Sequence, residues 1–185
     1  MNGSQAASVN GWGPVPVGEV LDAVLALKRR EFRRGTVAAA TRQLPAWRPE
    51  PGEAPILVVG CSGSAGASTV ALLLAELASR SRVIECAPPA SSGLVGAATA
   101  ELGERDGWVV GRRGDVGLQR RRDHLLSPAE VPVPLSSSPG MVTVVDLWWD
   151  LRQVLAAQGW LADLARTCPR VVVVTRATVP GMRQL

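Results

Sequence analysis

The stretch Gly60-Cys61-Ser62-Gly63-Ser64-Ala65-Gly66-Ala67-Ser68-Thr69 decides the fold that this sequence predicts. It follows a short apolar run at residues 56–59, which is typical of a strand buried on both faces. It leads into residues 68–79, where apolar positions recur at helical spacing. A glycine-rich turn between a buried strand and a helix is a common anion site, because its backbone N–H groups can point at the ligand. The stretch therefore predicts an α/β domain with a phosphate-sized ligand at this turn.

The alternation of strand and helix continues toward the end of the chain. Further short apolar runs, each typical of a buried strand, lie at residues 82–86, 142–145 and 171–175. Stretches with helical periodicity separate the runs, at residues 68–79, 91–104 and 150–166. Such alternation implies a mostly parallel sheet with helices on both faces, so we expect residues 55–185 to form a three-layer α/β/α domain. Residues 106–140 break the pattern and predict a hairpin or a mobile loop, with an arginine-rich stretch at 112–122.

The N-terminal part of the chain has a different composition. Residues 1–16 are rich in Gly, Ser, Asn and Pro and predict a flexible tail. Residues 17–42 predict an amphipathic helix with a basic end, and its cations complement the negative end of a helix dipole. Residues 43–54 contain several prolines and predict a stiff linker ahead of the α/β domain.

Composition restricts the class of protein. The net charge of +4 comes from 19 arginines and the single lysine Lys28, a bias that does not by itself indicate a nucleic-acid surface. The three cysteines, Cys61, Cys86 and Cys168, lack metal-ligand spacing and predict reduced thiols. No apolar run reaches the roughly 20 residues of a membrane span, and the first residues do not resemble a signal peptide. We therefore expect a cytoplasmic protein.

The glycine-rich turn carries the candidate ligand groups. Gly60, Gly63 and Gly66 would let backbone N–H groups approach phosphate oxygens closely. Ser68 and Thr69 would add hydroxyl groups at the start of the following helix, where P-loops hold a magnesium ligand. These five residues are the predicted cofactor-binding set.

In order and spacing, residues 55–185 resemble the P-loop ATPases of the ParA and MinD family. Residues 56–69 are similar to the first strand and P-loop of that family, and residues 83–88 to its second strand and switch segment. Residues 142–146 are similar to the Walker B strand that ends in its aspartate, here Asp146, and residues 171–178 to the strand that leads to the nucleotide base. The closest likeness is to a divergent actinobacterial branch associated with plasmids and integrative elements. The resemblance implies ATP or ADP with Mg²⁺ as the cofactor, and Ser68 and Asp146 on the side of the metal.

The chain departs from this family at the residues that carry the chemistry. Ala67 stands where the family has its phosphate-binding lysine, and Ser62 stands where the partition branch has a second, signature lysine. Ala87 stands where the family has a switch aspartate that positions the attacking water. Phosphoryl transfer depends almost wholly on placed positive charge and magnesium, so a Walker A motif that has degenerated in this way is not expected to support hydrolysis. Nucleotide binding without hydrolysis and a turn without any cofactor both remain open.

A dinucleotide site is the first alternative. The spacing Gly60-x-x-Gly63-x-x-Gly66 also resembles the fingerprint of extended short-chain dehydrogenases that bind NAD or NADP, and Glu85 lies where an acid would hold a ribose hydroxyl. Those enzymes use a catalytic Tyr and Lys. This chain has no tyrosine, and its one lysine precedes the domain.

A non-catalytic interaction module is the second alternative. Because ParA-like domains dimerise face to face over nucleotide, the resemblance implies a ParA-like homologue or a second copy as partner, in plasmid or chromosome maintenance or transfer. Trp148 and Trp149 follow Asp146 at a predicted rim, and tryptophan is enriched at interface hot spots. DNA contact by the arginines of residues 112–122 is favoured less than a solvated loop. The predicted sheet also ends near residue 175, where the family continues, so we expect an incomplete domain or an edge that a partner covers.

Overall fold

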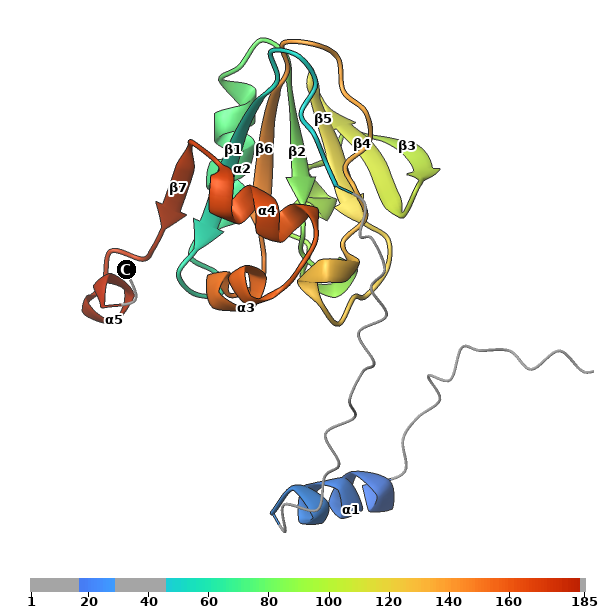
Figure 1. The fold of residues 1–185 in the computed structure, drawn as a ribbon, viewed down its shortest axis with the longest axis vertical. Coiled ribbons are helices and arrows are strands. Elements are labelled where there is room, and N and C mark those ends of the chain that lie inside the picture. The colour runs from blue at the N-terminus through green and yellow to red at the C-terminus, as the bar shows by residue number, and fades with distance from the viewer. Residues whose placement is uncertain (1–16, 29–45, 184–185) are drawn as a thin grey trace, which may run out of the picture. The chain divides into compact units, whose positions relative to one another are not determined.

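The computed structural model describes residues 17–28 and 46–183 (Figure 1). The chain divides into two units, Met1–Arg42 and Gln43–Leu185. In the first unit the described element is α1 (Val17–Lys28), which exposes the apolar side chains of Val17, Leu21 and Val24. The predicted tail at residues 1–16, and the predicted continuation of this helix to residue 42, lie outside the described residues. Within the described segments, no helix is long and apolar enough to cross a membrane.

Residues 46–183 contain a seven-stranded sheet in the order β3-β4-β5-β2-β6-β1-β7. Its strands are β1 (Ala54–Gly60), β2 (Ser81–Glu85), β3 (Ala100–Arg105), β4 (Trp108–Arg113), β5 (Val116–Arg121), β6 (Val142–Leu147) and β7 (Val171–Val174). The α-helices are α2 (Ala67–Glu76), α3 (Leu151–Ala156), α4 (Trp160–Thr167) and α5 (Val179–Met182). The strands from β5 to β7 in this order pair in parallel, whereas β3, β4 and β5 pair antiparallel. The prediction of an α/β domain with a mostly parallel sheet is confirmed.

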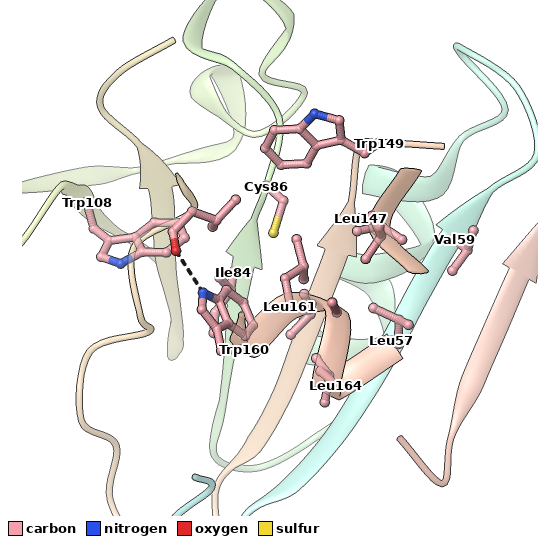
Figure 2. Close-up of a cluster of buried hydrophobic side chains, with 14 residues drawn as sticks. Leu57, Val59, Ile84, Cys86, Trp108, Leu147, Trp149, Trp160, Leu161 and Leu164 are labelled. Carbon is pink, nitrogen blue, oxygen red and sulfur yellow. Dashed lines mark hydrogen bonds between the residues drawn. The ribbon is translucent and has the colours of Figure 1, made fainter. Parts of the chain in front are cut away.

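Side chains of the central strands alternate between two apolar clusters, one on each face of the sheet. The first cluster, drawn in Figure 2, includes Leu57, Ile84 and Val145 from the strands and Trp160 and Leu161 from α4. The second includes Val58, Val83 and Val144 from the same strands and Ala71 and Ala75 from α2. Strands that bury both faces explain the continuous apolar runs in the sequence. Helix α2 therefore covers one face of the sheet, and α4 covers the other.

The helix predicted for residues 91–104 is wrong. One short 3₁₀ turn, Pro89–Ser91, ends where this segment begins, and the segment itself holds a second, Val95–Ala97, followed by most of β3. Its apolar spacing suggested a helix, but it also contains Gly93, Gly96 and Gly103, and glycine in a helix interior is unfavourable by about 1 kcal/mol relative to alanine. Local propensity therefore opposed the periodic pattern.

Two further expectations need correction. The predicted helix at residues 150–166 is two helices, α3 and α4, separated at Gly159, whose φ of 101° no helix can contain. The hairpin predicted within residues 106–140 is present as β4 and β5, with Arg112, Arg113 and Arg122 exposed, but two of its arginines are not solvated. Arg120 and Arg121 are only 5% and 3% exposed, because they lie in β5 and pack against neighbouring elements.

The segment ahead of β1 packs against the sheet domain. Trp47 contacts Trp160 edge to face, with ring centroids 5.5 Å apart. Glu53 forms an ion pair with Arg82 of β2 at 2.7 Å, and both side chains are almost completely buried. Part of the predicted linker therefore contributes to the core of this unit.

Candidate functional site

The neighbouring strands β1 and β6 send the chain to opposite faces of the sheet. From β1 the chain enters α2, which packs in one apolar cluster, and from β6 it enters α3 and α4, which pack in or against the other. In an open parallel sheet, loops that diverge in this way leave a crevice beyond the carboxyl ends of the two strands, and ligands bind there. We call this place the β1/β6 crevice.

The β1/β6 crevice is a cavity of about 730 Å³, within the range of small-molecule sites. Its walls are the glycine-rich turn at residues 60–69, the segment 146–150 after β6, and the residues Ser91 and Gly93. The structure thus brings the predicted site residues to one cavity, namely Gly60, Gly63, Gly66, Ser68, Thr69 and Asp146. The geometry is that of a ligand site at the switch point of the sheet.

The turn is shaped by two left-handed residues and anchored by the end of β7. Ser64 has a φ of 57° and Gly66 a φ of 95°. The Cys61 N–H donates to the Val174 carbonyl at 2.9 Å. The Arg176 guanidinium donates through Nε and Nη2 to the Ser64 carbonyl, at 3.2 Å in each case. The turn is therefore tied to the segment at and after β7 at two points.

Helix α2 begins beside the cavity without a side-chain cap. Gly66 occupies the N-cap position, and in the described structure no side chain accepts a capping hydrogen bond there. The first N–H groups of a helix, here those of Ala67, Ser68 and Thr69, have no partner within the helix and carry partial positive charge. Together with the open glycine turn, they form a place where an anion can accept several hydrogen bonds.

Asp146 lies near the carboxyl end of β6 and lines the cavity, although it is only 4% exposed. Burial raises the pKa of its carboxyl group above the ordinary 3.8, and hydrogen bonding from the Ser68 side chain opposes that shift. Asp150 also lines the cavity, and its Oδ1 accepts from the Arg152 N–H at 2.8 Å. Among the described residues that line the cavity, none is a lysine or an arginine. The crevice thus offers carboxylates and N–H groups but no side-chain cation.

Glu85 supports the crevice from inside the domain. It lies opposite Asp146 in the β2–β6 ladder and is 0% exposed. Its carboxylate accepts from the Ser92 hydroxyl and from the N–H groups of Gly93, at 2.7 Å, and Leu94, at 3.1 Å. A Cβ atom at Gly93 would lie 3.0 Å from Ser68 Cβ, so this turn packs closely on Ser68. Glu85 therefore holds the 92–94 turn against the start of α2 and does not itself line the cavity.

The two tryptophans after Asp146 have different environments. Trp149 is 6% exposed and lies in the apolar cluster with Cys86 (Figure 2). Trp148 is 47% exposed and lines the cavity. The Arg121 guanidinium stacks 4.6 Å from the centre of the Trp149 ring and donates to the Cys86 carbonyl at 2.8 Å. Sequence reasoning missed the roles of Arg121 and Gly93. The alternation of Val116 and Leu118 was the available signal that Arg121 continues a strand.

Fold and cavity together define an α/β protein with a ligand crevice at the switch point of a mostly parallel sheet. Comparison of the chain with protein-family models, with curated proteins and with solved structures finds no match.

Proposed function

We propose that this chain is a three-layer P-loop-type protein, similar to ParA and MinD, that binds an adenine nucleotide with Mg²⁺ in the β1/β6 crevice and acts by binding rather than hydrolysis. The observation that carries the proposal is the uncapped start of α2, which faces the same cavity as Ser68 and Asp146. Free N–H groups suit phosphate oxygens, and a carboxylate beside a hydroxyl suits a hard cation.

The residues of the crevice fit magnesium only in company with phosphate. In residues 17–28 and 46–183, no cluster of three or more His, Cys, Asp or Glu side chains is placed to hold a metal ion. Ser68 and Asp146 supply two oxygen ligands, and Mg²⁺ in nucleotide sites takes its remaining ligands from phosphate and water. The bound ion would neutralise phosphate charge that the cavity, which is lined by Asp146 and Asp150 without a cation, would otherwise repel. Nucleotide binding is therefore expected to require Mg²⁺.

Hydrolysis is not proposed, because the chain lacks the residues that, in the resembled family, place positive charge on the transferred phosphate and position the attacking water. Ala67, Ser62 and Ala87 stand at the positions of the two lysines and the switch aspartate of the resembled family. The arginines of β5 do not replace them, since Arg120 pairs with Glu101 and Arg121 is held by Cys86 and Trp149. A single missing transition-state donor already costs roughly a hundredfold or more in rate.

The dinucleotide alternative is favoured less because of Glu85. Its carboxylate is completely buried and already accepts three hydrogen bonds from the 92–94 turn, so it has no free face for a ribose hydroxyl. DNA binding by the β3–β5 segment is also favoured less. Three of its arginines, Arg113, Arg120 and Arg122, form ion pairs with glutamates, which partly neutralise the charge that phosphates would meet.

A partner at the crevice face is part of the proposed function. Trp148 exposes nearly half of its surface at the rim, and an exposed tryptophan beside a cavity is typical of an interface anchor. The resemblance implies that a ParA-like homologue or a second copy would bind this face, in plasmid or chromosome maintenance or transfer.

Calorimetric titration of the chain with ATP, ADP, NAD and NADP, each with and without Mg²⁺, tests the proposal. We expect heat from ATP or ADP only when Mg²⁺ is present, and no phosphate release over hours. Ala67→Lys would return a cation to the start of α2 and is expected to tighten binding by about tenfold or more. Silence from all four ligands, or binding of NAD alone, would overturn the nucleotide proposal.

Gly63 offers a matched pair of variants for the same titration. A Cβ atom added at this position meets no atom within 4 Å beyond its chain neighbours, and Asp and Asn have nearly the same size, so Gly63→Asp and Gly63→Asn make the same steric demand. Only the aspartate adds negative charge beside the phosphate, so Gly63→Asp is expected to weaken nucleotide binding about tenfold more than Gly63→Asn. Equal weakening would show that the phosphates lie elsewhere.

A further inference from the structure

The two edges of the sheet differ in chemistry. At one edge, β3 carries Glu101, Glu104 and Arg105 and has a register shift between Glu101 and Gly103, features that hinder a further strand from pairing. At the other edge, seen at the left of Figure 1, β7 consists of four valines. These four residues include no charge and no proline. The β7 edge therefore lacks the protection that β3 has.

The backbone of β7 has one row of groups turned away from the sheet. The carbonyl groups of Arg170 and Val174 accept from the Leu57 and Cys61 N–H groups of the β1 side, at 2.9 Å each. Because alternate residues of a strand face the same neighbour, the N–H and C=O groups of Val171 and Val173 point to the opposite, free side. In the described part of the chain no strand pairs with that side. These two residues offer an added strand up to four hydrogen bonds.

The side chains beside this row are apolar and exposed. Val171 is 47% and Val173 is 49% exposed, whereas Val172 and Val174 pack against the α2 cluster. A strand added at the β7 edge would bring its own side chains next to the two exposed valines, and such cross-strand apolar pairs stabilise a sheet. The edge thus offers both hydrogen bonds and apolar contact to a partner.

The charge around β7 selects the kind of partner. Arg170 precedes the strand and Arg176 follows it, and the sequence from residue 164 to residue 185 contains no acidic residue. A second copy paired antiparallel through β7 would bring the arginines at one end of each strand close to those of the other copy, which is unfavourable. We propose that β7 binds an extended apolar segment with acidic residues on both sides, from a partner protein, as an eighth strand of the sheet.

The proposal is tested with the full chain and a fluorescent nine-residue peptide, Asp-Glu-Thr-Val-Thr-Val-Thr-Glu-Asp, by anisotropy. The matched control peptide has the same five central residues between lysines. We expect the acidic peptide to bind at least about tenfold more tightly than the lysine peptide at low salt, with the difference shrinking at high salt. In amide exchange, binding of the acidic peptide is expected to protect Val171 and Val173, whose N–H groups are free, and to leave Val172 and Val174 as they were.

Two variants separate strand pairing from general attraction. Val173→Pro removes an outward N–H group while the β1 ladder keeps its bonds, and it is expected to abolish peptide binding. Arg170→Glu is expected to reverse the preference, so that the lysine peptide binds more tightly than the acidic one. If Val173→Pro does not fold, the proposal is tested by Arg170→Glu alone, through the reversal of which peptide binds more tightly.

Each other outcome overturns the proposal. Equal binding of both peptides, binding that survives in folded Val173→Pro, or no binding of the acidic peptide to the folded chain would each do so. A dimer in sedimentation that Val173→Pro dissociates would instead assign the β7 edge to a second copy of this chain. None of these outcomes depends on nucleotide. The test of the β7 edge is therefore independent of the test of the proposed function of the β1/β6 crevice.

Discussion

At the scale of single residues, the candidate site depends on backbone conformation as much as on side chains. Gly66 has a φ of 95° directly before α2, in the left-handed region that favours glycine. Gly63, in the same turn, does not have a φ in the left-handed region. A Cβ atom added at either position would meet no atom within 4 Å beyond its own chain neighbours. A difference between substitutions at these two glycines therefore reports backbone conformation alone.

Alanine at these two glycines gives the first prediction. Gly66→Ala forces an L-residue into a conformation that is unfavourable by about 1–2 kcal/mol, and the free energy of unfolding is expected to fall by that amount. Gly63→Ala is the control, with an expected change within about 0.5 kcal/mol. Urea denaturation measures both. Equal losses would mean that the turn does not have the conformation described.

The charge state of Asp146 gives the second prediction. Because burial raises its pKa, the folded carboxyl group binds a proton more readily than the unfolded one, whose ordinary pKa is 3.8. Its ionised form therefore lowers stability at neutral pH, and this loss disappears as the pH falls through the folded pKa toward the unfolded value. Asp146→Asn is expected to raise the free energy of unfolding at pH 7 by about 0.5–2 kcal/mol, the size of common stabilising changes.

Urea denaturation of Asp146→Asn and the parent chain at several values between pH 7 and pH 4 checks this. The difference between them is expected to shrink toward zero as the pH falls. Asp150→Asn is the matched control, because Asp150 is exposed and asparagine caps α3 as well as aspartate does. A destabilised Asp146→Asn at pH 7 would show that the charged carboxylate supports the fold instead.

At the scale of elements, α4 closes one face of the sheet through Trp160. This side chain is 4% exposed, contacts Trp47, and donates from Nε1 to the Val131 carbonyl at 2.9 Å (Figure 2). Trp148, in contrast, has only Trp149 as an aromatic neighbour among the described residues and exposes nearly half of its surface. The two tryptophans make a matched pair for truncation.

The third prediction compares their alanine variants. Trp160→Ala opens a cavity and leaves the Val131 carbonyl without its donor, so it is expected to cost about 3–5 kcal/mol. Trp148→Ala loses one edge-to-face contact and is expected to cost less than about 1.5 kcal/mol. Chemical denaturation followed by circular dichroism compares them without relying on tryptophan fluorescence. A larger loss for Trp148 would place it in the core of the domain.

At the scale of the whole molecule, a buried polar cluster joins the segment before β1 to the sheet. Arg82 donates to Glu53 at 2.7 Å and to Thr143 Oγ1 at 2.9 Å. Burial raises the pKa of Glu53, but hydrogen bonds from Thr143 and the Glu50 N–H, with the Arg82 charge, bring it below 4.5. The cluster therefore stabilises the fold at neutral pH and loses that effect as the pH falls through the lowered pKa, opposite in sign to Asp146.

Two fragments give the fourth prediction. Among the described residues, the members of both apolar clusters lie at Trp47 or later in the sequence. The free energy of unfolding of the fragment 43–185 is therefore expected to lie within about 0.5 kcal/mol of that of the full chain. The fragment 55–185 removes both Trp47 and Glu53, so it loses the contact with Trp160 and leaves the Arg82 charge buried without its partner. The loss of the buried ion-pair partner alone is expected to cost about 3–5 kcal/mol. Urea denaturation of the two fragments beside the full chain measures this. Equal stability of the fragments would show that residues 43–54, with Trp47 and Glu53, contribute nothing net.

Sequence patterns predicted the elements best where local chemistry and tertiary environment agree. The apolar runs at residues 56–59, 82–86, 142–145 and 171–175 correspond to β1, β2, β6 and β7 within a few residues. In the central strands the runs follow from burial on both faces, whereas β7 at the edge of the sheet leaves Val171 and Val173 half exposed. The prediction of a helix at residues 91–104 was wrong because it rested on apolar spacing alone and did not take account of the three glycines in this segment.

By itself, the sequence determined that this chain has buried strands joined by helices, and that a glycine-rich turn and Asp146 each follow a strand. Only the tertiary structure decided that β1 and β6 are neighbours whose chains leave to opposite faces, which creates the crevice that joins Ser68 to Asp146. It also decided that Glu85 and Arg121 turn inward, and that β7 keeps a free edge among the described strands. The physical reason is that strand order and burial depend on pairings between residues tens of positions apart, which no local pattern of side chains encodes.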